Sequence, residues 1–219
     1  MRAIGKVVEL ELKDLKNKSN VGTPVVLSKK DIKRCILNKE LIIDPLNEDL
    51  LGPCDINLRI SENYARIKNI QQPLDLGEVG SESINGKYFR IQPNEHLLRK
   101  YFSFQKDKKY IIQPNEHLLI ESIEYLKMPK YLTALIALRS TFSRLGLSTP
   151  PTLIDPGFKG KIVFHLIGSS YPIWLYEGIA VFKVIFMYTP TNIEAYSGKY
   201  QDQYGIILPK GDPIWRKKR

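Results

Sequence analysis

The chain has 219 residues, a hydrophobic content of 43%, a charged content of 26% and a formal net charge of +10 at pH 7. These values fit one globular domain, with or without arms, and no apolar run approaches the roughly 18 residues that a membrane-spanning helix needs. The N-terminus also lacks the apolar core of a signal peptide, so we expect a cytoplasmic protein with no membrane partner.

The cysteines, the histidines and the net charge restrict which bonds and ligands the chain can be expected to have. Cys35 and Cys54 do not form a CxxC pair and are too few for a disulfide framework, and the three histidines show no metal-ligand spacing. The positive charge calls for an anionic partner, which could be nucleic acid, a membrane surface or a polyphosphate ligand. Because the charge is spread along the chain, apart from the basic run Trp215–Arg219, nucleic-acid binding is disfavoured, and a small, highly charged substrate fits as well.

The first predicted elements are an arm and a helix. Residues 1–26 read as an N-terminal arm with a possible strand at Lys6–Leu12. Ser28 and Asp31 then form a capping-box pattern, and apolar residues recur at helical spacing after it. The sequence therefore predicts a helix that runs to about Lys39.

After this helix, short apolar segments alternate with Pro, Gly and Asn, which is the pattern of many short strands joined by turns. The predicted strands are Ile56–Ile60, Tyr110–Gln113, His117–Leu126, Tyr131–Leu138, Gly160–Gly168 and Ile179–Tyr188. A short helical turn is expected in STFSRLGL, after one of these strands. The fold class is therefore mainly β, as a barrel or sandwich.

One octapeptide, IQPNEHLL, occurs twice, at Ile91–Leu98 and at Ile112–Leu119. In each copy apolar residues precede Pro-Asn and Leu-Leu follows, which predicts a strand, a tight turn and a second strand. Two copies are too few for a repeat architecture. We interpret the pair as a tandem duplication of one β-hairpin, in which one copy sits in the fold and the other forms an extra hairpin or loop.

Three polar segments carry residues suited to chemistry. The segment Arg139–Gly146 gathers two arginines and several hydroxyls, which suit phosphate oxygens, although a solvated surface helix would look the same. The segment Thr152–Gly160 places the carboxylate of Asp155 in a Pro-Gly turn, which it could merely organise. The segment Tyr196–Gly205 is polar, aromatic and glycine-bearing, and it could fold over a ligand or be an ordinary loop.

Taken in order, RSTFSRLG, TLIDPGFKGKI and KYQDQ resemble the dCTP deaminase branch of the trimeric dUTPase superfamily. The similarity extends from LSKKDIKRCILNKELIIDP and GPCDINLRI, near Leu27, to about Gly205. It implies a distorted, jelly-roll-like β-barrel of the dUTPase type with a short N-terminal helix. It also implies a homotrimer with active sites at subunit interfaces, and dCTP or dUTP as substrate.

The resemblance also implies roles for individual residues. Arg139, Ser140 and Arg144 would contact the phosphates and the reacting base from a neighbouring subunit, and Asp155 would hold the deoxyribose 3′-hydroxyl. The C-terminal segment would cover the triphosphate, and Mg²⁺ would come with the triphosphate rather than sit in a protein cage. The residues implied for substrate binding are Arg139, Ser140, Thr141, Ser143, Arg144, Asp155, Val163, Tyr196, Lys199 and Gln203. Those implied for catalysis are Ser140, Arg144, Asp155 and His165.

The same comparison sets domain boundaries. Residues 27–208 would form the dUTPase-like domain, and residues 209–219 a basic tail. The second copy of the octapeptide, followed by a strand and the MPKYL segment, matches the family pattern. The first copy is therefore interpreted as the insert, at about residues 87–107.

One position departs from the family. The deaminases carry a glutamate in the strand after IDPGF, where it moves protons during attack of water on the cytosine ring, and this chain has His165 there. A histidine can transfer protons near neutral pH, but it cannot accept the same pair of hydrogen bonds as a carboxylate. The zinc deaminase patterns HxE and PCxxC are also absent from the sequence.

Three functions therefore compete at this stage. The first is a dCTP deaminase that supplies dUTP for dTTP precursor synthesis, with His165 moving protons. The second is a diphosphatase that cleaves dUTP to dUMP, alone or together with deamination, for which Asp155 is retained. The third is a nucleotide-binding relative without catalysis.

Overall fold

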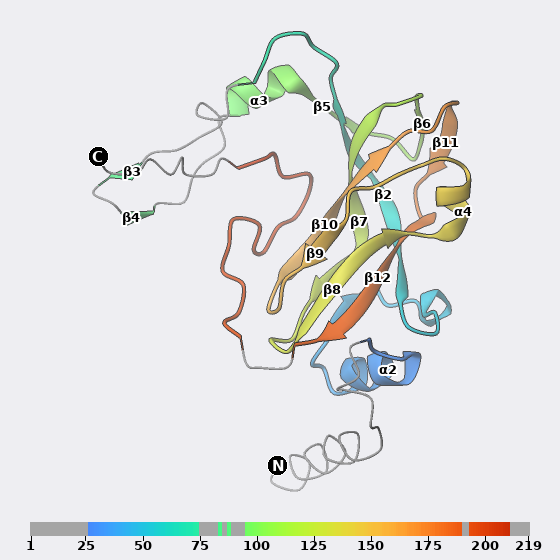
Figure 1. Cartoon of the computed structure of the whole chain (residues 1–219), viewed down its shortest axis with the longest axis vertical. Helices are drawn as coiled ribbons and strands as arrows, with labels where there is room; N and C mark the ends of the chain where they lie inside the picture. Colours follow the sequence, from blue (N-terminus) through green and yellow to red (C-terminus); the bar gives the residue numbers. More distant parts are fainter. Residues whose placement is uncertain (1–25, 75–82, 85–86, 89–94, 190–192, 211–219) are drawn as a thin grey trace, which may run out of the picture.

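The computed structural model describes residues 26–74, 83–84, 87–88, 95–189 and 193–210 (Figure 1). The predicted strand Lys6–Leu12 and the basic run Trp215–Arg219 lie outside the described residues. The helices are α2 (Lys29–Leu37), α3 (Glu95–Tyr101), α4 (Ser140–Arg144) and the 3-10 turn η1 (Glu48–Leu50). The strands are β1 (Ile42–Asp44), β2 (Ile56–Ile67), β3 (Ser83–Ile84), β4 (Lys87–Tyr88), β5 (Phe102–Lys106), β6 (Lys109–Ile112), β7 (His117–Lys127), β8 (Leu132–Leu138), β9 (Thr152–Ile154), β10 (Lys159–Ile167), β11 (Ile173–Tyr176) and β12 (Ala180–Tyr188). In the part of the chain described, no helix is long and apolar enough to cross a membrane.

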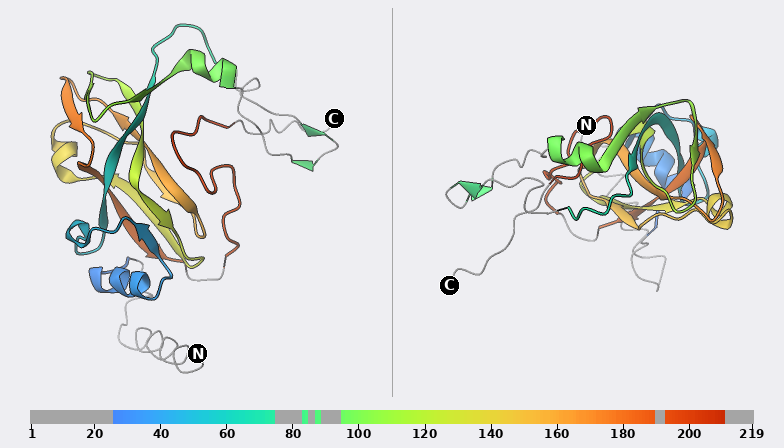
Figure 2. Two further views of the ribbon diagram at one scale, coloured as in Figure 1. Left: turned by 180° about the vertical axis from the view of Figure 1, so that it is seen from behind. Right: turned by 90° about the horizontal axis from the view of Figure 1, so that it is seen from above.

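An antiparallel sheet of eight strands forms the body of the molecule and curls on itself (Figure 2). Its main path is β1-β7-β2-β12-β8-β9, with β10 paired to β7 and β5 paired to β2. The long strand β2 belongs to both halves, and its pairing with β7 has a register shift between Ile60 and Tyr64. Because bulges increase twist and bend a strand, this irregularity helps the sheet to close. The predicted mainly β, barrel-like fold is confirmed.

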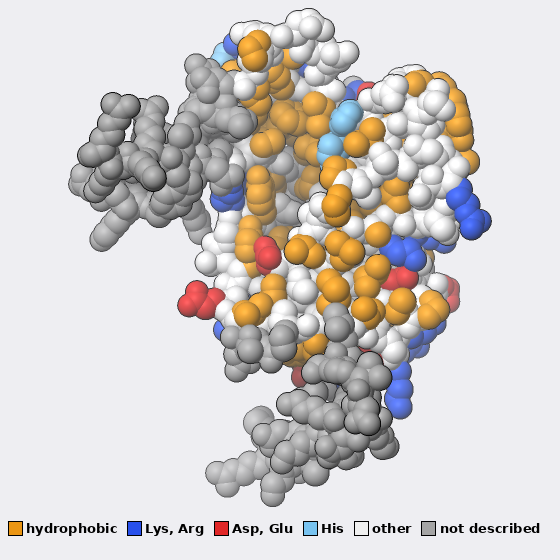
Figure 3. Space-filling view, viewed as in Figure 1, with side chains coloured by type: hydrophobic (Ala, Val, Ile, Leu, Met, Phe, Trp, Pro, Cys, Tyr) orange, Lys and Arg blue, Asp and Glu red, His pale blue; other side chains and the backbone are white. Residues whose placement is uncertain are grey.

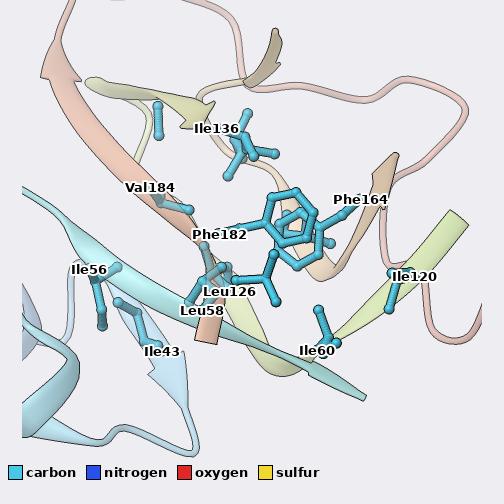
Figure 4. Packing of buried hydrophobic residues seen from close by; sticks show 14 of the residues in the cluster. Ile43, Ile56, Leu58, Ile60, Ile120, Leu126, Ile136, Phe164, Phe182 and Val184 are labelled. Atoms are coloured by element: carbon cyan, nitrogen blue, oxygen red, sulfur yellow. The ribbon is translucent and has the colours of Figure 1, made fainter. Parts of the chain in front are cut away.

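Side chains point alternately into and out of the barrel along each strand, and the inward-pointing ones form its core. In β10, each second residue from Gly160 to Leu166 is buried, and its neighbours are partly exposed. Phe164 stacks on Phe182 of β12 with ring centroids 3.9 Å apart, and branched aliphatic residues surround the pair (Figure 4). Because a one-residue slip would turn Phe164 outward, this packing fixes the register of β10. The residues between these core positions face the opposite side, where the candidate site lies.

Helix α2 begins as predicted. The Ser28 side chain accepts a hydrogen bond from the Asp31 backbone, and the Asp31 side chain accepts one from the Ser28 backbone. Ile32 and Cys35 bury the inner face of the helix. The helix ends at Leu37, slightly before the predicted Lys39, which adopts a positive φ of 60°.

The second copy of the octapeptide has the predicted strand-turn-strand form. The turn is closed by a 3.1 Å hydrogen bond from the Glu116 amide to the Gln113 carbonyl, and Asn115 has a left-handed φ of 55°, which asparagine tolerates. The two flanking strands do not pair with each other, because β6 pairs with β11 and β7 pairs with β10. This copy is therefore a corner between two sheets rather than a hairpin.

Residues 91–94 of the first copy lie outside the described residues. The rest of the copy does not repeat this structure, so the prediction of an extra hairpin or loop is wrong for Glu95–Leu98. Its residues from Glu95 onward form helix α3, which continues to Tyr101. Leu98 and Tyr101, three positions apart on one helix face, are buried against Phe102 and Leu208. The same Glu-His-Leu-Leu sequence is therefore helical in the first copy, where one face of the helix packs against Phe102 and Leu208. Tertiary packing here overrides the local preference.

The segment predicted as an insert, residues 87–107, ends inside the main sheet. Strand β5 pairs with β2 from Phe102 to Lys106, opposite residues 63–67. Strands β1, β9 and β11 were also not predicted, and each has only three or four residues. Segments this short carry too little alternation to be recognised.

Candidate functional site

A cavity of about 320 Å³ lies between β8, β9, β10 and the C-terminal segment, residues 193–210. We call it the cleft. Its walls are mostly apolar or aromatic, and four of the residues predicted to bind substrate line it, namely Asp155, Val163, Tyr196 and Gln203. An apolar hollow with a few converging polar groups is the usual form of a small-molecule site. Figure 3 shows this face of the molecule, with apolar side chains gathered in a hollow and histidines at the surface beside it.

The turn after β9 sets the carboxylate at the mouth of the cleft. The amide of Phe158 donates a 3.1 Å hydrogen bond to the carbonyl of Asp155, and Gly157 has a φ of 79°. A Cβ atom at Gly157 would lie 2.7 Å from the Cβ of Ala195, so a glycine is needed both for the turn and for the approach of the C-terminal segment. The Asp155 side chain remains exposed.

The C-terminal segment docks on β10 of its own chain as a short parallel extension. Gln203 forms a bridge with Gly160, and the amide of Lys161 donates a 3.0 Å hydrogen bond to the Gln203 carbonyl. The Gln203 side chain donates to the Lys161 carbonyl at 2.7 Å. The Gln201 side chain bonds the Lys159 amide and the Gly157 carbonyl at 2.9 and 3.0 Å. The segment thus forms one wall of the cleft.

The buried carboxylate of Glu121 binds the C-terminal segment at Gly205. Glu121 of β7 has a side chain only 2% exposed, yet it accepts hydrogen bonds from the Asn63 side chain at 2.9 Å and from the Gly205 amide at 2.5 Å. Lys161 supplies a positive charge 3.7 Å away. These partners satisfy a charge that would be costly to bury alone.

The predicted arginine and hydroxyl residues lie on and beside helix α4, away from the cleft. Phe142 is buried and fixes the helix, while the guanidinium of Arg139 donates to the Ala180 carbonyl at 2.7 Å. The other predicted residues of this helix are exposed, and they are Ser140, Thr141, Ser143 and Arg144. Figures 1 and 2 place α4 across the barrel from the C-terminal segment, and none of its residues lines the cleft.

His165 lies in β10, two residues beyond the cleft-lining Val163, and its strand partner Leu119 also lines the cleft. Its Nε2 atom is 2.9 Å from Nδ1 of His117. Burial, together with the neighbouring His117, lowers the pKa of His165. The backbone carbonyl of His165 accepts a 2.6 Å hydrogen bond from the Thr149 hydroxyl, which ties β10 to the loop after α4.

The structure therefore divides the predicted residues into two groups. Asp155, Val163, Tyr196 and Gln203 meet in the cleft with His165 beside it, whereas the α4 residues lie apart and Lys199 does not line the cleft. Sequence reasoning missed His117, which it treated only as one half of a duplication. The strand register that brings His117 next to His165 gives no signal in the sequence. Among the described residues there is also no group of three or more His, Cys, Asp or Glu side chains placed to hold a metal ion.

Comparisons with known proteins identify the family of this chain. A family model described as dCTP deaminase-like matches residues 26–189. A probable deoxyuridine 5′-triphosphate nucleotidohydrolase of Sulfolobus islandicus rod-shaped virus 1 is 37% identical over 86% of this chain and 100% of its own length. A dCTP deaminase of Metallosphaera sedula is 33% identical over 85% of this chain and 98% of its own length.

The fold has a solved counterpart. The structure of 2′-deoxycytidine 5′-triphosphate deaminase from Agrobacterium tumefaciens matches with a TM-score of 0.56 at 16% identity, over 76% of this chain and 49% of that one. The match confirms the predicted mainly β, barrel-like fold. With the family model and the relatives above, it shows that this chain belongs to the dCTP deaminase-like family of nucleotide hydrolases and is an enzyme of that family.

Proposed function

We propose that the enzyme deaminates dCTP to dUTP and ammonia, and so supplies the precursor of dTTP. The observation that carries this proposal is the cleft, in which Asp155, Val163 and Tyr196 surround a space of about 320 Å³ beside His165. Asp155 would accept a hydrogen bond from the 3′-hydroxyl of deoxyribose. His165, whose pKa is lowered, would be neutral near pH 7 and able to take a proton from the attacking water.

The triphosphate requires positive charge that the cleft of one chain does not supply. We propose a homotrimer in which α4 of a neighbouring subunit brings Arg139, Ser140 and Arg144 to the triphosphate and the reacting base, with Thr141 and Ser143 beside them. The exposed polar face of α4, far from the cleft of its own chain, supports this arrangement. Mg²⁺ would enter with the triphosphate as part of the substrate.

A second function is favoured by one specific position. Where deaminases of this family have a glutamate, this chain has His165, and a relative 37% identical is named a probable deoxyuridine triphosphate nucleotidohydrolase. A diphosphatase that cleaves dUTP to dUMP needs Asp155 to help activate water but does not need the glutamate. The two functions share the cleft and differ in the bond that is broken.

Product analysis separates these functions. The purified protein is incubated with dCTP or dUTP and Mg²⁺, and ammonia and pyrophosphate are measured separately. Ammonia from dCTP that is lost in His165→Ala supports the deaminase, whereas pyrophosphate without ammonia selects the diphosphatase. Nucleotide binding without either product would contradict both.

A complementation experiment tests the shared site. Arg144→Ala and Asp155→Asn should each be inactive alone, because each removes one half of the site. In a mixture unfolded and refolded together, about one quarter of the interfaces of random trimers would combine an intact α4 with an intact Asp155. Activity of that size in the mixture is the expected result. A mixture as inactive as its components, at the molecular mass of a trimer, would contradict the intersubunit arrangement.

A further inference from the structure

The His117–His165 contact, which we call the histidine pair, joins two strands on the side of the sheet that faces the cleft. In the antiparallel register, His165 is opposite Leu119 and His117 is opposite Ile167, so the two histidines are diagonal neighbours. Side chains at such positions lie on one face and within reach of each other. The 2.9 Å separation of Nε2 of His165 and Nδ1 of His117 is a hydrogen-bond distance.

This hydrogen bond restricts where protons can be. A neutral imidazole carries one N–H and one bare nitrogen, so in a neutral pair one ring must donate and the other must accept. If His165 donates from Nε2, its Nδ1 is the bare nitrogen and can take a proton. If His117 donates instead, Nδ1 of His165 carries a hydrogen and cannot act as a base. In either arrangement the pair has one basic nitrogen and one N–H at its outer ends.

A protonated carboxyl group has the same two capabilities, since one oxygen accepts and the other donates. A lone histidine cannot offer both while neutral unless both of its nitrogens face the substrate. The histidine pair therefore supplies with two rings what a single acidic side chain supplies with two oxygens. This gives a physical reason why a histidine at position 165 would need a partner.

We propose that His117 is the positioning partner of His165 in proton transfer, an inference that depends on the deaminase function proposed above. His117 accepts the Nε2–H of His165, which leaves Nδ1 as the base. In the reaction, an O–H bond of water breaks as the N–H bond at Nδ1 forms, and this N–H bond then breaks as the proton passes to the nucleobase nitrogen or the leaving ammonia. During that interval the lone pair of His117 Nδ1 stabilises the positive charge on His165.

Two carboxylates near the histidine pair, Glu121 and Glu116, each form an ion pair with a basic side chain. On the same sides of β7 and β10, Glu121 is paired with Lys161. In the turn before β7, Glu116 is paired with Arg66 of β2. These two carboxylates are therefore engaged by cations rather than by the histidine pair.

The chain offers a matched set of variants. His117→Ala removes the acceptor, and His117→Asn places an amide oxygen near the position of Nδ1, which can still accept from His165. His96→Ala is the control, since His96 has the same flanking sequence but is exposed on α3. We expect His117→Ala to lower kcat for ammonia release by about 100-fold or more, with KM changed little, because positioned proton transfer contributes this much. His117→Asn should recover much of the rate, and His96→Ala should retain it.

Nitrogen NMR of the imidazole rings gives a readout independent of activity. In the wild type His165 should show one dominant tautomer with hydrogen on Nε2, and in His117→Ala it should show a mixture. Full ammonia release by His117→Ala, or a His165 tautomer that is the same with and without His117, overturns the proposal. If the wild type releases no ammonia but shows the single tautomer, the deaminase function and the catalytic role of the histidine pair both fail, while the hydrogen bond itself stands.

Discussion

Docking of the C-terminal segment depends on Gly160, and Gly160→Ala tests this dependence. Gly160 has a φ of 142°, and an added Cβ atom would lie 2.8 Å from the carbonyl oxygen and 2.9 Å from the amide nitrogen of Gln203. Both neighbours are backbone atoms and cannot rotate away, so the segment itself must move. Gly178 is the matched control, because its φ of 83° is also positive but nothing lies within 4 Å of an added Cβ.

The expected loss of docking free energy follows from the hydrogen bonds between β10 and the C-terminal segment. Each substitution should cost about 1–3 kcal/mol of backbone strain. Gly160→Ala should in addition break the two hydrogen bonds between Lys161 and Gln203, which are 3.0 and 2.7 Å long. At about 0.5–1.5 kcal/mol for each bond, docking should weaken by about 1–3 kcal/mol, or roughly 5- to 150-fold.

Limited trypsin digestion measures this change. Lys199 lies within the segment, and its side chain donates a 3.1 Å hydrogen bond to the Lys210 carbonyl when the segment is docked. Cleavage after Lys199 should be faster in Gly160→Ala than in Gly178→Ala by the factor given above, where cleavage follows the population of the open form. The KM for the nucleotide should rise in parallel. Equal cleavage rates in the two variants would refute the reasoning, because both carry the same added methyl group.

Three further changes have defined outcomes. Because its pKa is lowered on folding, His165 should make the protein less stable as pH falls below about 6.5, and His165→Gln should reduce this slope in urea unfolding at pH 5 to 7.5. Glu121→Ala should lower the free energy of unfolding by about 3–5 kcal/mol because buried partners lose their acceptor, and a loss below 1 kcal/mol by denaturant titration would contradict this. Leu98→Ala should cost about 2–5 kcal/mol, whereas the exposed control Leu37→Ala should cost less than about 0.5 kcal/mol, as read from thermal unfolding of both.

Long strands with a regular alternation of apolar and polar residues were predicted best from the sequence. The strands with sustained alternation, such as Gly160–Gly168 and Ile179–Tyr188, were predicted to within one residue at each end. Strand β2 was predicted only to Ile60, because SENYARI beyond it is polar. That part of β2 is a strand because β5 and β7 hydrogen-bond to its two edges, which is information from other parts of the chain.

The duplicated octapeptide shows most directly what local sequence cannot decide. In the second copy, the Glu116 carbonyl accepts a 2.8 Å hydrogen bond from the Gly168 amide, and Leu118 pairs with Leu166 in the sheet. The first copy is followed instead by Arg-Lys-Tyr, and burial of Leu98 stabilises a helix. Since the eight residues are identical, the difference must come from their partners.

The candidate site was predictable in its residue types and not in its contacts. The turn at Asp155 and the segment around Tyr196 carry recognisable polar and glycine patterns, and both line the cleft. The pairing of His117 with His165 depends on the register of β7 against β10, which the core residues on the other face of the sheet fix. The proposed functional contact on one face is thus determined by apolar packing on the other.

The same reasoning applies to the two halves of the proposed site. Buried Phe142 and the hydrogen bond from Arg139 to the Ala180 carbonyl fix α4. The C-terminal segment, which lies across the barrel from α4 in Figure 1, and the turn at Asp155 line the cleft. Because each half is held by its own packing, a single chain of the proposed trimer can be fully folded and still present only half of the groups that we propose to bind the nucleoside triphosphate. On the proposed trimer, assembly rather than folding is therefore the step that completes the catalytic centre, and substitutions in α4 should impair the reaction while leaving the cleft of the same chain intact.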